Sequence, residues 1–231
     1  MNARLKVFLE ERNYTYPHLK KTSKILWDLV LTPQSERDEL VDKLCALMRA
    51  DPNFALSVAN RCRQLGEPLN GTNPPKKLSD IFDRIDPFKL VAKVAPNNDV
   101  SQVMAANLEA YYIRVSKLAA DNAAALAKAH PDDEVLALYF ALQPVLPLLS
   151  LAQLDPDVAA VVLQADDVEL QCQKHYGFSL TELTDAMVGE YAMPSMMDPR
   201  EPTTLRANAV FRGETLRTKT RRSMVRKTLV S

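Results

Sequence analysis

The sequence predicts an all-α protein, and three of its features lead to that prediction. Apolar residues recur at helical spacing through most of the chain. Only five glycines occur against fifteen prolines, fewer glycines than a sheet-rich fold with many tight turns would use. Several prolines directly follow a helix-capping residue, as in Asp51-Pro52 and Asp86-Pro87. A capping side chain followed by proline is typical of a helix start, because proline fits the first helical position.

The first half of the chain divides into short helices at these signals. A first helix, opened by Leu5, should end before Pro17, and the stripe Ile25, Leu26, Leu29 and Val30 predicts a second. Thr32-Pro33 is expected to start a helix that runs to about Ala50. Asp51-Pro52 should start the next, which Gly66 can terminate. Residues 66–77 then form a loop, Ser79 is expected to cap a short helix, and Asp86-Pro87 should open another.

The second half is predicted to be helical as well. The longest helix should run from about Asp99 to His130, and its many alanines favour a central position because neighbours can approach it closely. Further helices are expected over 132–143, 156–164 and 167–175. Ser179 and Glu182 have the spacing of a capping box, which predicts a helix to about Ala192. The apolar run Val158–Leu163 is interpreted as buried helix rather than strand, because it follows Asp155-Pro156.

The composition indicates a cytoplasmic globular protein. Of the 231 residues, 47% are apolar, which is enough for one domain with a sizeable core. The N-terminal stretch contains acidic residues and is not expected to be a signal peptide, and no transmembrane segment is predicted. The three cysteines, Cys45, Cys62 and Cys172, form no CxxC pair and are interpreted as reduced, packed thiols.

The net charge of zero conceals two oppositely charged regions. Residues 199–231 contain nine Lys/Arg and two Asp/Glu, whereas residues 1–198 have an acidic excess of seven. We therefore divide the chain into a helical domain, 1–198, and a basic, flexible tail, 199–231. The tail is the candidate partner-binding segment, whether for nucleic acid, an anionic membrane surface or an acidic protein. Its candidate residues are Arg217, Lys219, Arg221, Arg222, Arg226 and Lys227.

Two stretches resemble the HDOD family, helical output domains related to the HD metal-dependent phosphohydrolases. In residues 43–92, a helix leads to Asp51-Pro52, which opens a second helix ending near Ala59-Asn60, followed by a loop and a short helix. In residues 176–194, Tyr-Gly leads into a helix that ends at Tyr191, before Met193-Pro194. The resemblance spans roughly residues 20–195, and it implies a bundle of helices with a regulatory role.

The same resemblance implies that the catalytic pair of HD enzymes is missing. Those enzymes need a His-Asp pair, with further ligands from other helices, to hold metal ions that activate water. Leu142 and Gln143 stand at the pair position, and Leu180 stands where another His is usual. No catalytic residues, metal or cofactor are therefore expected.

The three histidines of the chain do not predict a metal site either. His130 with Asp132 and Asp133 is the best alternative metal cluster, but these acids also suit the first turn of a helix. His175 is expected at a helix C-terminus, and His18 is expected to be exposed beside Lys20 and Lys21.

These observations lead to three hypotheses about function. The first is a non-catalytic bacterial signalling or regulatory domain that acts by binding another protein, of unknown identity and oligomeric state. The second is a nucleic-acid-associated regulator that uses the basic tail. The third is a divergent phosphohydrolase with unrecognised ligands, against which Leu142 and Gln143 argue.

Overall fold

The computed structural model describes residues 3–10, 17–70, 73–96, 106–129, 131–142, 146, 161–162 and 165–190. These residues form an all-α fold without a β-strand, as the sequence predicted. The first helices are α1 (Ala3–Glu10), α2 (Lys20–Leu29), the 3-10 turn η1 (Gln34–Glu36), α3 (Arg37–Ala50) and α4 (Pro52–Gln64). The others are α5 (Leu78–Ile81), α6 (Pro87–Val94), α8 (Ala106–Ala129), α9 (Glu134–Leu142), α12 (Val168–Tyr176) and α13 (Leu180–Glu190).

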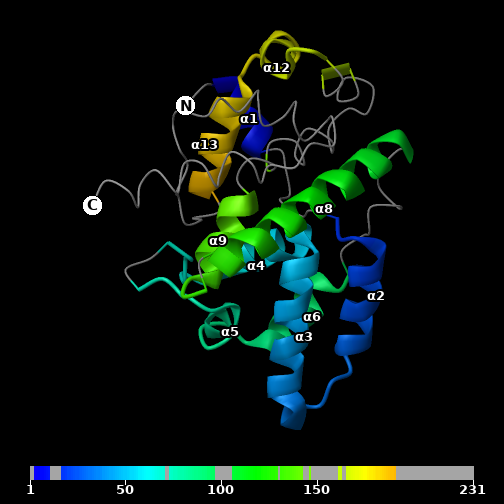
Figure 1. The fold of residues 1–231 in the computed structure, drawn as a ribbon, viewed down its shortest axis with the longest axis vertical. Coiled ribbons are helices and arrows are strands. Elements are labelled where there is room, and N and C mark those ends of the chain that lie inside the picture. Colours follow the sequence, from blue (N-terminus) through cyan, green and yellow to red (C-terminus); the bar gives the residue numbers. More distant parts are fainter. Residues whose placement is uncertain are drawn as a thin grey trace.

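The helix α8 crosses the middle of the molecule in the view of Figure 1. The helices α2, α3, α5 and α6 lie on one side of it, and α1, α12 and α13 lie on the other. With 24 residues it is the longest described helix, about 36 Å in length. It packs most extensively against α9 and also contacts α3 and α4. The expected central position of this alanine-rich helix is therefore confirmed.

The most enclosed helix is α4, which the sequence did not single out. Every residue from Pro52 to Ala59 is buried, and Cys62 continues the buried face. A helix that buries all its sides in this way needs apolar residues around its whole circumference, and Phe54-Ala55-Leu56 with Val58-Ala59 supplies them. Its neighbours are α3, α6 and α8. It therefore forms the centre of the core.

Four predicted helix ends have the expected capping groups. Asp51 and Asp86 accept hydrogen bonds from the amides of Asn53 and Phe88, each at 2.9 Å. Ser179 and Glu182 form the reciprocal capping box at the start of α13. Gly66 has a positive φ of 78°, the left-handed conformation that ends a helix.

Two predicted starts are wrong. Pro33 is extended and leads into the 3-10 turn, so the α-helix begins only at Arg37. The short helix α5 is capped not by Ser79 but by Asp80, whose carboxylate reaches back to the amides of Lys76 and Lys77. A side chain inside the first turn thus replaces the expected preceding cap.

Part of the second half lies outside the described residues. This part includes the helix start predicted at Asp99, most of the helix predicted over 156–164, and the helix end predicted near Ala192. Of the run Val158–Leu163, Val161 and Val162 are described and helical; Val162 is buried but Val161 is exposed. The predicted tail, 199–231, also lies outside the described residues.

Candidate functional site

A buried junction forms where the start of α4 meets the segment that precedes α2. Asp51 is fully buried there, and each of its carboxylate oxygens accepts a backbone hydrogen bond. One accepts from the amide of Asn53 and the other from the amide of Leu19, both at 2.9 Å. Asp51 therefore caps α4 and also holds a segment 32 residues earlier against it. This second contact could not be read from the sequence, because a cap reveals only its local partner.

His18 lies in the same junction, which corrects the expectation that it is exposed. Its side chain is fully buried and meets the ring of Phe54 edge-on, with 5.9 Å between ring centroids. Burial lowers the pKa of the imidazole, while the negative charge of Asp51 and a hydrogen bond to the Val94 backbone oppose that shift. Lys20 and Lys21, the first two residues of α2, are exposed. Nearby lysines were thus a poor guide to the environment of His18.

Asn53 extends the junction towards α8. The side-chain amide of Asn53 donates to the hydroxyl of Ser116 at 3.1 Å, and its backbone carbonyl oxygen accepts from the hydroxyl of Ser57 at 3.1 Å. The side-chain oxygen of Asn53 is buried and has no hydrogen-bond partner within the part of the chain that the structure describes. The polar groups of this junction mainly link α4 to its neighbours, so they serve to position helices.

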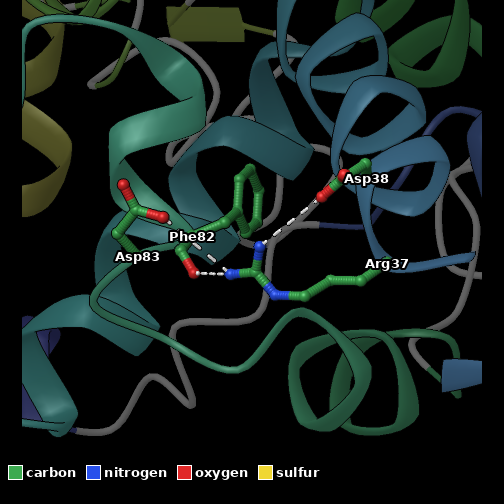
Figure 2. Close-up of polar contacts among 4 residues, drawn as sticks. All are labelled: Arg37, Asp38, Phe82 and Asp83. Atoms are coloured by element: carbon green, nitrogen blue, oxygen red, sulfur yellow. Dashed lines mark hydrogen bonds and ion pairs between the residues drawn. The ribbon is translucent and has the colours of Figure 1, made fainter. Parts of the chain in front are cut away.

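Two charged contacts link helices at the surface. Arg37 at the start of α3 donates to the carbonyl oxygen of Phe82 at 2.7 Å and lies 4.0 Å from the carboxylates of Asp38 and Asp83 (Figure 2). Arg49 at the end of α3 donates to Glu134 at 2.6 Å. The charged side chains of these contacts are at least partly exposed, and exposed ion pairs contribute little stability. They join the two ends of α3 to Phe82 and Asp83 and to Glu134 of α9.

The three cysteines are free and buried, which confirms that they are packed thiols. Burial raises the pKa of Cys45 to about 11 and the pKa of Cys62 and Cys172 to about 12. A nucleophilic cysteine needs the opposite environment, partly exposed and with its thiolate stabilised. These thiols are therefore inert core residues.

The sequence-predicted metal positions are placed only in part. Leu142 and Leu180 are both fully buried apolar residues, whereas Gln143 and His130 lie outside the described residues. His175 is at the end of α12, as expected, and is exposed. Among the described residues, no three His, Cys, Asp or Glu side chains are grouped so that they could hold a metal ion. The candidate binding residues Arg217, Lys219, Arg221, Arg222, Arg226 and Lys227 lie outside the described residues.

An exposed apolar surface at the end of α2 is the feature that the sequence reasoning missed. Trp27, the single tryptophan of the chain, is 54% exposed, and Leu31 just beyond the helix is 86% exposed. Val30 between them is also exposed, although the sequence placed it in the apolar stripe of this helix; only Leu26 and Leu29 of that stripe are buried. We call Trp27, Val30 and Leu31 the Trp27 patch. A signal for it was present in the sequence, because Trp27 does not belong to the apolar stripe of Leu26 and Leu29 that faces the core.

Comparison with known proteins does not indicate a function for these residues. No protein family model matches the chain, and no curated protein or solved structure is significantly similar to it. None of the described helices is long and apolar enough to cross a membrane.

Proposed function

We propose that the chain is a non-catalytic regulatory domain that acts by binding another protein. The observation that carries the proposal is the Trp27 patch, where the only tryptophan and two aliphatic side chains are exposed together. Tryptophan is enriched among the residues that dominate binding energy at protein interfaces. In a monomer without partners a tryptophan is ordinarily buried, since burial of a large aromatic ring contributes strongly to stability.

The junction at Asp51 supports the non-catalytic part of the proposal. Its buried carboxylate is occupied by two backbone amides, and a general base must instead reach a proton of the substrate. The resemblance to HDOD domains points the same way, because Leu142 replaces the histidine of the catalytic pair. Leucine has no atom that can ligate a metal.

Affinity capture from a lysate of the source cells, followed by chemical cross-linking of the complex, tests this function. The proposal expects one or a few proteins that bind the purified chain stoichiometrically and are displaced by excess unlabelled chain. It also expects no turnover of phosphodiesters or cyclic dinucleotides by protein purified without chelator. Metal-dependent turnover that is lost on chelation would favour the phosphohydrolase hypothesis and reject this one.

The second candidate function is nucleic-acid association through residues 199–231. The observation that favours it is the excess of seven positive charges in that segment. Phe211 is the only aromatic residue there, so stacking would contribute little to binding. Retention of DNA or RNA by the full chain, lost when residues 199–231 are deleted and weakened steeply by salt, would support this function. Absence of retention by the full chain would reject it.

A further inference from the structure

We propose that the outward face of α2 binds an acidic amphipathic segment of a partner protein, with aliphatic residues covering Trp27 and carboxylates facing the neighbouring lysines. The inference rests on the proposed protein-binding function and adds the surface and the chemistry of the partner. What carries it is the arrangement of basic and apolar side chains on one face of this helix.

Four exposed residues define this face. Lys20, Lys24, Trp27 and Leu31 follow one another at intervals of four, three and four residues, the spacing that places side chains on one side of a helix. Leu31 lies in the turn directly after α2 and continues the row. We call these four residues the α2 stripe.

The opposite face of α2 is the one that packs on the domain. Its buried residues are Thr22, Ser23, Leu26 and Leu29. The helix contacts α6, and the segment before it is held on α4 by the hydrogen bond from Leu19 to Asp51. The α2 stripe is therefore presented to solvent by a helix whose other side is fixed.

The charge around the α2 stripe selects an acidic partner. Lys20, Lys21 and Lys24 lie within one and a half turns, whereas Asp28 is the only acidic residue of α2. In the described part of the chain, no carboxylate lies within ion-pair distance of these three lysines. Residues 1–198 as a whole carry an acidic excess of seven. Within residues 1–198, a basic helix on an acidic domain attracts an acidic ligand locally while the rest of the domain repels it, which favours docking at α2 over the rest of the domain.

The apolar part of the surface sets the second requirement on the partner. Trp27 and Leu31 are exposed by 54% and 86%, and Val30 lies beside them. Carboxylates alone would leave these side chains in water, so the partner needs aliphatic residues at helical or alternating spacing between its acids. An interfacial membrane helix needs a broad free apolar face, but the apolar face of α2, with Leu26 and Leu29, is already buried in the domain. The observations thus favour a protein segment over a lipid surface.

The test uses the full chain and a fluorescein-labelled helical peptide of glutamate and leucine, with binding followed by fluorescence anisotropy. We expect saturable binding that weakens as salt is added, because exposed charges contribute to it. Trp27→Ala and Lys24→Glu should each weaken binding by about tenfold or more, as expected of residues at the centre of an interface. In the wild-type chain, the emission of Trp27 should shift to the blue when the peptide covers the ring.

The matched control is a similar pair of residues on another helix. Leu170 and Lys174 are exposed one turn apart on α12, so Leu170→Ala truncates an exposed apolar side chain and Lys174→Glu reverses a lysine charge away from the α2 stripe. Both should leave peptide affinity unchanged within about twofold. Equal losses in the control variants, or no saturable binding of the acidic peptide, would overturn the assignment. Binding to phosphatidylserine vesicles but not to the peptide would also overturn it, in favour of a membrane surface.

Failure of this inference is distinguishable from failure of the proposed function. If the chain captures a stoichiometric protein partner and Trp27→Ala captures it equally well, the domain binds proteins through another surface. If no protein is captured by the wild-type chain, the proposed function itself is wrong.

Discussion

Replacing Asp51 by alanine should destabilise the protein by more than the loss of an ordinary helix cap. The change removes the acceptor for the amide of Asn53, and loss of such a cap costs about 0.5–2 kcal/mol. It also leaves the partly buried amide of Leu19 without its acceptor, which costs about 1–3 kcal/mol more. The expected decrease in the free energy of unfolding is therefore about 1.5–5 kcal/mol.

The chain contains a matched control for this prediction. Asp86 caps α6 through the same Asp-Pro sequence and accepts from the amides of Phe88 and Lys89, but it is exposed and, among the described residues, it holds no distant segment. Asp86→Ala should cost only the cap, about 0.5–2 kcal/mol. Asp51→Asn and Asp86→Asn separate the two effects, because asparagine is a good cap yet cannot offer carboxylate oxygens to both amides.

Urea denaturation of the four variants, followed by far-ultraviolet circular dichroism, provides the measurement. We expect a clear loss of stability for Asp51→Asn and almost none for Asp86→Asn. If Asp51→Ala costs no more than Asp86→Ala, the hydrogen bond to Leu19 does not stabilise the fold. The α2 stripe would then not be anchored in the way described.

Three further predictions concern the core. Burial lowers the pKa of His18 below its value in the unfolded chain. The free energy of unfolding should therefore be highest above the ordinary histidine pKa and should decrease as the pH falls from there towards the pKa of the folded protein. In urea titrations over this pH range, His18→Asn should make the decrease smaller. Tyr139→Phe should cost about 1–3 kcal/mol in thermal unfolding, because it leaves the buried carbonyl of Ala55 without the 2.8 Å hydrogen bond from the phenol. A thiol reagent at neutral pH should modify the native protein no faster than it unfolds, since burial keeps the cysteines protonated; rapid modification of any of Cys45, Cys62 and Cys172 would contradict this.

Local signals in the sequence predicted several helix starts correctly, but not all of them. Asp51-Pro52 and Asp86-Pro87 start helices as expected because the cap, the proline and the amide that it serves lie within three residues. Thr32-Pro33 has the same local form and fails, because Pro33 is extended and a 3-10 turn intervenes before α3. Pro fixes only its own φ, so it is compatible with both outcomes.

The candidate sites were less predictable because they depend on distant neighbours. The burial of His18 follows from contacts with Phe54 and Asp51, which nothing in the sequence around it reveals. Trp27 could have been found, since it departs from the helical period of the buried residues. The likeness to HDOD domains and the roles of Arg217 to Lys227 stay predictions.

The pattern of contacts between helices has a consequence for how the chain folds. The two most extensive contacts join described helices that are neighbours in sequence, α8 with α9 and α3 with α4. Contacts between neighbours close short loops, so these helical hairpins are expected to assemble rapidly and early. The hydrogen bond from Tyr139 to Ala55 and the ion pair of Arg49 with Glu134 join residues 84 and 85 positions apart. We expect these contacts to form late, so that docking of the α8–α9 hairpin on the α3–α4 hairpin limits the folding rate.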